Sequence, residues 1–216
     1  MPQVRKASLA TQAEVNAIVP AAGASRRMGR HKLLLPFRGT TMLGSTVAAL
    51  RAGGATQVIL VHAADDGALA EWAARHGCVA AVNGRPDDGM LSSIQAGLLA
   101  LGQPARLAKR GGTLLVCPGD LPLLRGATVA LLLSATAAAA AWLGVPRYRG
   151  TRGHPLAIAA ALAPEILLLD PDIGLRQLRQ RHRQRALEVD TDDPGTVRDV
   201  DTPKDYAELT AAPSPG

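Results

Sequence analysis

The stretch VNAIVPAAGASRRMGRHK, residues 15–32, decides how this chain is interpreted. It opens with a short apolar run, Val15 to Ala21, which is typical of a buried strand. A loop of small and basic residues, Ala22 to Lys32, follows directly. In α/β folds the ligand lies at the carboxyl ends of the strands, so the loops that follow strands are where functional residues are expected.

Beyond this stretch, short apolar runs alternate with helical patterns. Strands are expected at 57–62, 78–82, 113–117, 141–146, 155–159 and 186–190, and helices at 41–52, 66–76, 91–101, 128–138, near 164, at 173–181 and at 203–210. This alternation predicts a Rossmann-like α/β fold, a mostly parallel sheet with helices on both faces. One domain is expected over residues 15–210, between a disordered lead-in (1–14) and a loose tail (211–216).

The composition is typical of a globular protein that binds anions. Of the 216 residues, 47% are hydrophobic and 19% are charged, which favours a packed core over disorder. The net charge of +6 favours nucleotides or phosphorylated metabolites as partners. Aromatic residues make up only 2%, which argues against base stacking with single-stranded nucleic acid. Cys78 and Cys117 lack metal-ligand spacing, so neither a disulfide framework nor a zinc site is predicted.

Two segments bear on localisation. The first fourteen residues are polar and contain no apolar core of a signal peptide. The uncharged stretch from Gly126 to Val145 approaches the roughly 20 residues that span a bilayer. Its Thr, Ser and Ala residues favour a buried helix followed by a strand instead. A cytoplasmic protein without a membrane partner is expected.

The loop after the first strand has the residues of a phosphate site. Small residues let backbone N–H groups approach an anion, Arg27 offers a bidentate contact to phosphate oxygens, and Lys32 offers a compact charge. The candidate nucleotide-binding residues are Ala21, Ala22, Gly23, Ala24, Ser25, Arg27 and Lys32. The spacing of a P-loop is missing. The alternative interpretation is a glycine turn beside two solvated arginines.

Polar residues follow other predicted strands as well. Ser93 lies in what is expected to be the first turn of a helix, where an ordinary helix cap is the alternative. Asp120 follows the strand at 113–117, and nucleotide-bound Mg²⁺ usually takes one or two protein carboxylates. Asp199 and Asp201 precede a Thr-Pro pair that starts a helix well but does not account for these carboxylates.

Two basic segments are open to more than one interpretation. The turn from Arg147 to Pro155 contains three arginines and His154, and suits either an anionic acceptor or solvent. The run from Arg176 to Arg185 suggests nucleic acid, but a solvated helix face is favoured. No helix-turn-helix, zinc-finger or RNA-binding signature accompanies it, so no nucleic-acid partner is predicted.

Residues 20–32 resemble the signature of the molybdenum-cofactor nucleotidyltransferases, L-A-[AG]-G-x-S-x-R-M-G-x-x-K, and match it everywhere except at Pro20. The resemblance continues in register from residue 15 to residue 206. Its other motifs are G-M-x-x-S-I-x-x-G at 89–97, x-x-D-x-P at 118–122, G-x-x-G-H-P at 150–155 and D-x-D-T-P-E-D-[LY] at 199–206. Lys204 stands where the last motif has Glu.

The resemblance implies the fold of the nucleotide-diphospho-sugar transferases and a Mg²⁺-dependent transfer of CMP from CTP to the phosphate of the molybdopterin cofactor. Lys32, Arg27 and Asp120 are the implied catalytic residues. Asp120 and Asp201 would hold Mg²⁺, with Asp199 in reserve. Ser93 would lie near the base, and Arg152 and His154 would bind the acceptor. Ala22 resembles the cytidylyl-transferring branch, since the guanylyl branch has Gly there.

Other functions stay open at this point. GTP as the donor or another phosphorylated acceptor would suit the same fold. A non-catalytic carrier of the cofactor is a further alternative. A protein that only binds the cofactor would not need all three of the charged residues Lys32, Asp120 and Asp201. A molybdenum enzyme that receives the product is the expected protein partner.

Overall fold

The computed structural model describes residues 14–23 and 31–211. The predictions for the lead-in, for Ala24, Ser25 and Arg27, and for the tail therefore lie outside the described residues. Within the described ranges, no helix has both the length and the apolar character that crossing a membrane requires.

Eight strands form one mixed sheet. In sheet order they are β10 (Ala186–Thr191), β7 (Leu143–Tyr148), β9 (Leu156–Ala159), β6 (Thr113–Val116), β1 (Val15–Pro20), β4 (Gln57–Ala63) and β5 (Val79–Asn83), with β8 (Thr151–Arg152) beside β7. Strand β9 is antiparallel to β6 and β7, and β8 is antiparallel to β7. The other neighbours are parallel. The predicted α/β fold with a mostly parallel sheet is confirmed.

The helices and a small hairpin complete the fold. The helices are α1 (Met42–Ala52), α2 (Gly67–Arg75), α3 (Gly89–Ala100), α4 (Pro104–Arg110), α5 (Gly126–Ala138), α6 (Ala163–Ile166), α7 (Leu175–Arg181) and α8 (Pro203–Ala211). Strands β2 (Pro36–Phe37) and β3 (Thr40–Thr41) pair as the hairpin. Helix α4, β2, β3 and β8 are additions to the predicted elements. Helix α4 begins at Pro104, which the first turn of a helix accepts.

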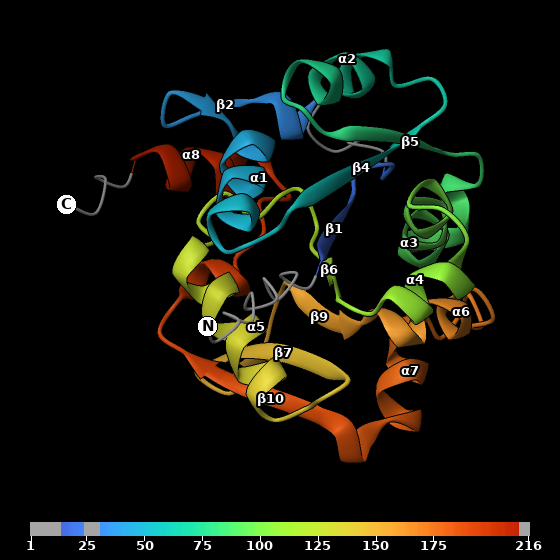
Figure 1. Cartoon of the computed structure of the whole chain (residues 1–216). Helices are drawn as coiled ribbons and strands as arrows, with labels where there is room; N and C mark the ends of the chain where they lie inside the picture. The colour runs from blue at the N-terminus through green and yellow to red at the C-terminus, as the bar shows by residue number, and fades with distance from the viewer. Residues whose placement is uncertain (1–13, 24–30, 212–216) are drawn as a thin grey trace, which may run out of the picture.

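Two apolar layers cover the sheet because side chains alternate along each strand. Along β1, Ala17 and Val19 pack with residues of α1, α2 and α5, whereas Ile18 packs with residues of α3, α4, α6 and α7. Figure 1 shows the two groups of helices on opposite sides of the strands. The predicted covering of both faces is therefore confirmed.

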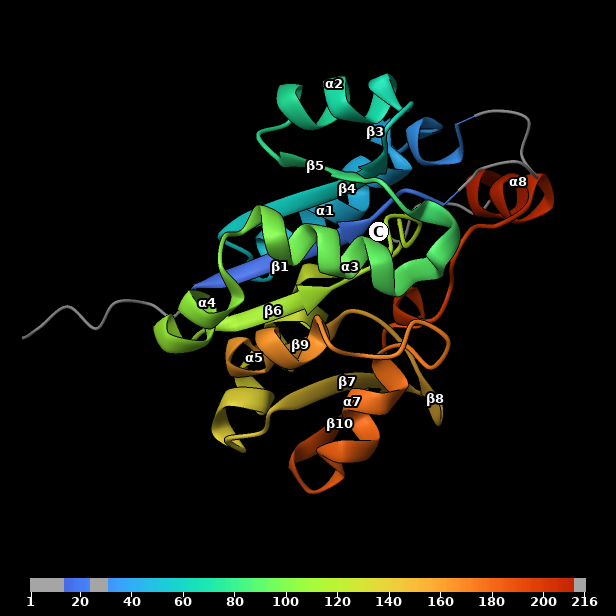
Figure 2. The ribbon, with the colours of Figure 1, turned by 90° about the vertical axis from the view of Figure 1, so that its right-hand side faces the viewer.

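Close packing holds α3 against the central strands. Figure 2 shows α3 crossing the sheet in front of β1 and β4. A Cβ at Gly97 would lie 2.6 Å from Ile18 Cγ2, so the helix approaches the sheet only because this residue has no side chain. This contact fixes the start of α3 near the carboxyl end of β1.

The carboxyl ends of the parallel strands β1, β4, β5 and β6 meet at one edge of the sheet. The C-terminal segment crosses the same edge. The amide of Val200 donates a hydrogen bond of 3.2 Å to the carbonyl of Asp120, which follows β6. This backbone contact brings residues 199–201 beside the loop after β6.

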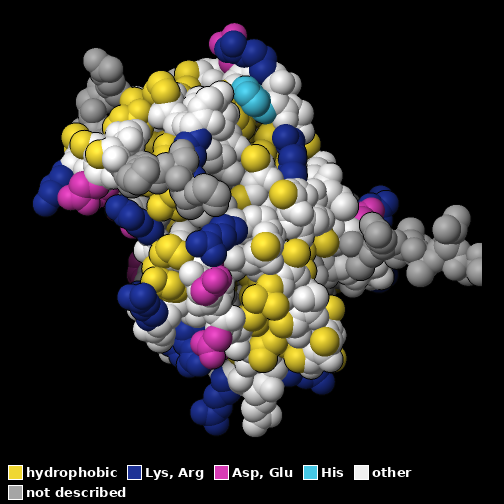
Figure 3. Space-filling view, turned by 90° about the vertical axis from the view of Figure 1, so that its left-hand side faces the viewer, with side chains coloured by type: hydrophobic (Ala, Val, Ile, Leu, Met, Phe, Trp, Pro, Cys, Tyr) yellow, Lys and Arg dark blue, Asp and Glu magenta, His cyan; other side chains and the backbone are white. Residues whose placement is uncertain are grey.

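Basic side chains are dispersed on the face shown in Figure 3. Lys and Arg lie there among acidic and apolar groups and do not gather into one stripe. A protein that tracks a nucleic-acid backbone presents a continuous basic surface. The described part of this face does not have that arrangement.

Candidate functional site

Three charged side chains meet at the carboxyl edge of the sheet. Lys32 Nζ donates hydrogen bonds of 2.7 Å to Asp120 Oδ2 and of 2.7 Å to Asp201 Oδ1. Lys32 follows the loop after β1, Asp120 follows β6 and Asp201 precedes α8. The fold therefore unites residues that are 88 and 169 positions apart in the sequence.

The two carboxylates keep Lys32 charged, but they differ in how far they are exposed to solvent. Burial alone would lower the pKa of Lys32, but hydrogen bonds and charge attraction from Asp120 and Asp201 outweigh it and raise that pKa. Lys32 is thus an ammonium at neutral pH. The side chains of Lys32 and Asp120 are each 16% exposed, whereas that of Asp201 is 50% exposed. One carboxylate is therefore fixed within the site and the other lies open to solvent.

A third carboxylate lies nearby. Burial, followed by repulsion from Asp201 and Asp120, raises the pKa of Asp199 above its ordinary value. The raised pKa indicates that negative charge is concentrated at this edge of the sheet. Asp199 is not among the hydrogen-bond partners of Lys32.

The arrangement fits a divalent cation. Two carboxylate oxygens converge on one ammonium nitrogen, and hard oxygen ligands of this kind suit Mg²⁺ or Mn²⁺. Within residues 14–23 and 31–211, no group of three or more His, Cys, Asp or Glu side chains has metal-binding geometry. A cation here would therefore take one or two protein carboxylates and fill its other positions with water or phosphate.

A cavity of about 320 Å³, here called the nucleotide cavity, opens beside this cluster. Its lining includes Ala21, Gly23, Lys32, Ser93 and Asp120, all of which the sequence predicted for the site. Ala22 is buried beside the cavity but is not part of its lining. The structure thus brings the described part of the predicted nucleotide loop together with the loops after β5 and β6.

The prediction that Ser93 lies in the first turn of its helix is wrong. Helix α3 already begins at Gly89, and its cap residue Asp88 makes no side-chain capping bond. Gly89 has a positive φ of 79°, which favours glycine and lets the chain turn into the helix early. Ser93 consequently lies in the second turn, where its hydroxyl is buried at the wall of the nucleotide cavity.

Asn83, for which the sequence suggested no role, fixes this wall. Its side-chain amide donates hydrogen bonds of 2.8 Å to Ser92 Oγ and 3.0 Å to Ser93 Oγ. Its Oδ1 accepts a bond of 2.8 Å from the amide of Arg85. Asn83 is the last residue of β5, at the carboxyl edge of the sheet. A polar residue at the end of a strand is a feature from which the sequence could have predicted a place in the site.

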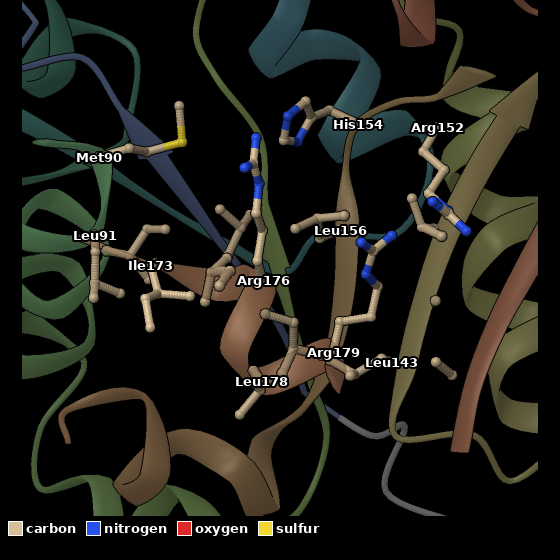
Figure 4. Close-up of a pocket in the computed structure, with 18 of the residues that line it drawn as sticks. Met90, Leu91, Leu143, Arg152, His154, Leu156, Ile173, Arg176, Leu178 and Arg179 are labelled. Atoms are coloured by element: carbon tan, nitrogen blue, oxygen red, sulfur yellow. The ribbon is translucent and has the colours of Figure 1, made fainter. Parts of the chain in front are cut away.

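A second and larger cavity of about 770 Å³, here called the arginine cavity, adjoins the first. Met90 lines both cavities. Figure 4 shows Arg152, His154, Arg176 and Arg179 on the walls of the arginine cavity. The two predicted acceptor residues, Arg152 and His154, therefore share one cavity next to the nucleotide cavity.

The environments of Arg152 and His154 differ. Arg152 Nε donates a hydrogen bond of 2.6 Å to Glu188 Oε1, so its charge is already partly neutralised. Burial lowers the pKa of His154, and a hydrogen bond with the backbone of Val116 together with attraction from Asp120 and Asp199 offsets this only in part. His154 is therefore neutral at neutral pH. Its Nδ1 atom is buried and has no hydrogen-bond partner among the described residues.

Residues 176–185 were expected to form a solvated helix face, and Arg176 in this run is exposed and Arg179 half-buried. Arg176 and Arg179, three residues apart in α7, line the arginine cavity. Residues three apart lie on the same face of a helix, and this spacing was the signal available in the sequence. Elsewhere in the run, Arg181 pairs with Glu165 at 3.0 Å, and Arg183 is exposed.

Comparison with known protein families identifies this architecture. Residues 17–186 match the MobA-like NTP transferase domain. The nicotine blue oxidoreductase of Paenarthrobacter nicotinovorans is 33% identical over 196 residues, which cover 87% of this chain and 92% of that protein.

Solved structures show the same fold. Rv0371c from Mycobacterium tuberculosis H37Rv has a TM-score of 0.74 at 32% identity, covering 93% of this chain and 98% of that one. Its manganese complex has a TM-score of 0.69 at 30% identity, covering 93% and 100%. A nucleotidyl transferase from Methanothermobacter has a TM-score of 0.73 at 25% identity, covering 91% and 96%.

Proposed function

Because the chain belongs to the MobA-like NTP transferase domain family and is a nucleotidyltransferase, we propose that it transfers CMP from CTP to the phosphate of the molybdopterin cofactor. The observation that carries this proposal is the contact of Lys32 with Asp120 and Asp201 beside the nucleotide cavity, which Lys32 and Asp120 line. A pure carrier of the cofactor would not need this arrangement of charges.

The proposed reaction is an in-line displacement at phosphorus. A phosphate oxygen of the acceptor forms a bond to the α-phosphorus of CTP, and the bond from that phosphorus to the bridging oxygen breaks, so that pyrophosphate leaves. A phosphate monoester is mostly dianionic at neutral pH, and no protein general base is required. The protein contributes positioning and the neutralisation of charge.

Each residue of the cluster then has a distinct role. Asp120 and Asp201 would hold Mg²⁺ or Mn²⁺, which neutralises phosphate charge when bound. The ammonium of Lys32 would turn toward the α-phosphate, as its flexible four-carbon stem permits. Arg27, outside the described residues, would bind the leaving pyrophosphate. His154, neutral and beside the acidic cluster, would donate or accept a hydrogen bond to the acceptor rather than attract its charge.

The preference for cytosine rests on the wall of the nucleotide cavity. Ala22 is buried beside that cavity, where the guanylyl-transferring branch has glycine. On the wall of the cavity, the hydroxyl of Ser93 is held by Asn83 and offers a polar partner to a base. The carbonyl oxygen and the amino group of a cytosine ring would pair with such polar groups.

The first test is the release of pyrophosphate by the purified protein with a divalent cation and molybdopterin cofactor, with CTP and GTP compared in parallel. We expect release with CTP. Asp120→Asn should reduce turnover by about a hundredfold or more, because one carboxylate of the cation site is lost. Asp192→Asn, at a side chain that is 93% exposed, is the matched control and should retain activity.

The result would distinguish the parts of the proposal. Release with GTP alone would overturn the assignment of the base but retain the chemistry. An Asp120→Asn variant that is folded and fully active would contradict the cation site. No release with either nucleotide, from protein shown to bind CTP, would contradict the proposed acceptor.

A second candidate function follows from the relative that is named an oxidoreductase. Its 33% identity extends over 92% of its length, so the two proteins share more than a local motif. The loop after β1 lacks the G-x-G-x-x-G pattern of dinucleotide-binding folds. A redox assay with nicotine blue would test this activity, and its dependence on Asp120 would show whether it uses the same site.

A further inference from the structure

The arginine cavity has an apolar floor. Leu91 and Ile94 of α3, Ile158 of β9 and Leu178 of α7 line it, and each of these side chains is almost fully buried. At the rim, Met90 and Ile173 expose large apolar side chains to the solvent. A hollow with this lining suits a ligand that has an apolar body.

Cationic groups project over this floor from one short helix. Figure 4 shows the side chain of Arg176 extending toward His154 and that of Arg179 extending toward Arg152. Within the described residues, neither Arg176 nor Arg179 forms an ion pair with a carboxylate, whereas Arg152 is bound by Glu188. Asp172 is the only acidic residue in the lining that the structure describes. The cavity thus retains uncompensated positive charge.

Core packing and hydrogen bonds to α6 hold helix α7 in place. Leu178 packs into the core beneath the cavity, and Glu165 of α6 accepts hydrogen bonds from Arg181 and His182 at 3.0 and 2.7 Å. Side chains that extend from an anchored helix form a site with a fixed spacing. Guanidinium groups also bind oxyanions through paired N–H donors and stack on flat rings.

We propose that the arginine cavity binds the body of the second substrate, and that Arg176 and Arg179 bind an anionic group of that molecule distinct from its reacting phosphate. The ligand class is a flat ring system whose faces pack on the apolar floor and which carries an additional oxyanion. This inference rests on the proposed nucleotidyl transfer for the identity of the second substrate, but the cavity and its charges are independent of that reaction.

The position of the cavity predicts the orientation in which the ligand binds. Met90 separates it from the nucleotide cavity, and His154 lies at the end influenced by Asp120 and Asp199. The reacting phosphate would therefore lie on the Met90 side of His154, and the ring system would extend over the apolar floor toward α7. The additional anion would lie where the side chains of Arg176 and Arg179 extend, toward His154 and Arg152.

A kinetic experiment tests the residues during turnover. Arg176→Ala and Arg179→Ala should each raise the KM of the acceptor about tenfold or more, because a charge-assisted hydrogen bond is lost, and leave the KM of CTP unchanged. Arg176→Lys and Arg179→Lys should recover part of the affinity through charge alone. Arg183→Ala removes an exposed arginine of the same run outside the cavity and should behave as the wild type.

A binding experiment keeps the test independent of turnover. The probe is 8-anilinonaphthalene-1-sulfonate, an apolar ring system with one oxyanion, whose fluorescence rises on burial. Arg176→Ala and Arg179→Ala should bind it about tenfold more weakly than the wild type and Arg183→Ala, with unchanged melting temperature and CTP affinity. Equal binding by the variants and the wild type would overturn the proposal. Normal probe binding to an inactive wild type would instead locate the failure in the proposed function.

Discussion

Lys32 occupies the position that a cation would take in this site. Its ammonium lies 2.7 Å from an oxygen of each of two carboxylates, and their attraction outweighs the cost of its burial. In the nucleotide-free protein, this ammonium and a divalent cation would therefore compete for the same two oxygens. Residue types alone could not indicate this contact, because it joins three separate loops.

The first prediction concerns this competition. Lys32→Gln should bind Mn²⁺ in the absence of nucleotide about tenfold more tightly than the wild type, because a competing positive charge is removed. The same variant should lose most of its pyrophosphate release. Mn²⁺ binding followed by electron paramagnetic resonance measures the first effect.

The matched control for this change is Lys204→Gln. The side chain of Lys204 is 84% exposed and pairs only loosely with Glu208, at 3.9 Å. This variant should match the wild type in both measurements. Weaker Mn²⁺ binding by Lys32→Gln than by Lys204→Gln would show that Lys32 supports the cation site instead of competing for it.

At the scale of elements, α6 and α7 are joined by one carboxylate. Burial alone would raise the pKa of Glu165, but hydrogen bonds from His182 and Arg181 outweigh it and lower that pKa. A carboxyl group whose pKa is lower in the folded state stabilises the fold above its unfolded pKa. This contribution is lost as the pH falls through the folded value.

The corresponding prediction is a stability difference that depends on pH. At neutral pH, Glu165→Gln should lower the free energy of unfolding by about 0.5–1 kcal/mol, the usual size for a partly exposed ion pair. The difference should shrink as the pH falls below the ordinary Glu value of 4.5. Urea unfolding at several pH values measures it, and a difference that does not depend on pH would contradict the role of the charge.

The boundaries of elements were predicted where local residues decide them. A helix was predicted at 41–52, and α1 spans Met42–Ala52 with Thr41 as its cap, which accepts a bond from the amide of Gly44. The start of α3 was not predicted, because the helix already begins at Gly89, whose positive φ leads the chain into it. Short pieces such as β8 depend on their partners and leave almost no local pattern.

At the scale of the whole molecule, Asp193 ties the segment after β10 to α5. Its carboxylate is fully buried and accepts bonds from the Arg125 amide at 2.9 Å, the Thr128 hydroxyl at 2.8 Å and the Gly195 amide at 2.9 Å. Asp193 therefore joins residues that are 65 and 68 positions away in the sequence. These bonds fix the path by which the C-terminal segment returns to the carboxyl edge of the sheet, where the candidate site lies.

Asp193→Ala should therefore lower the free energy of unfolding by about 3 kcal/mol or more, because several buried donors would lose their acceptor at once. Asp192→Ala, one residue earlier and 93% exposed, should change it by no more than about 0.5 kcal/mol. Urea denaturation of both variants measures the difference. Equal effects would show that the buried carboxylate does not hold the segment.

Sequence patterns alone predicted the α/β class, the sheet covered on both faces and the loops that carry Lys32 and Asp120. These follow from alternating apolar patterns and from the rule that ligands lie after strands. Which charges are compensated could not be predicted from these patterns. Arg152 is bound by Glu188 whereas Arg176 and Arg179 face a cavity, because the partner of a charge depends on chain segments that are brought together only by folding.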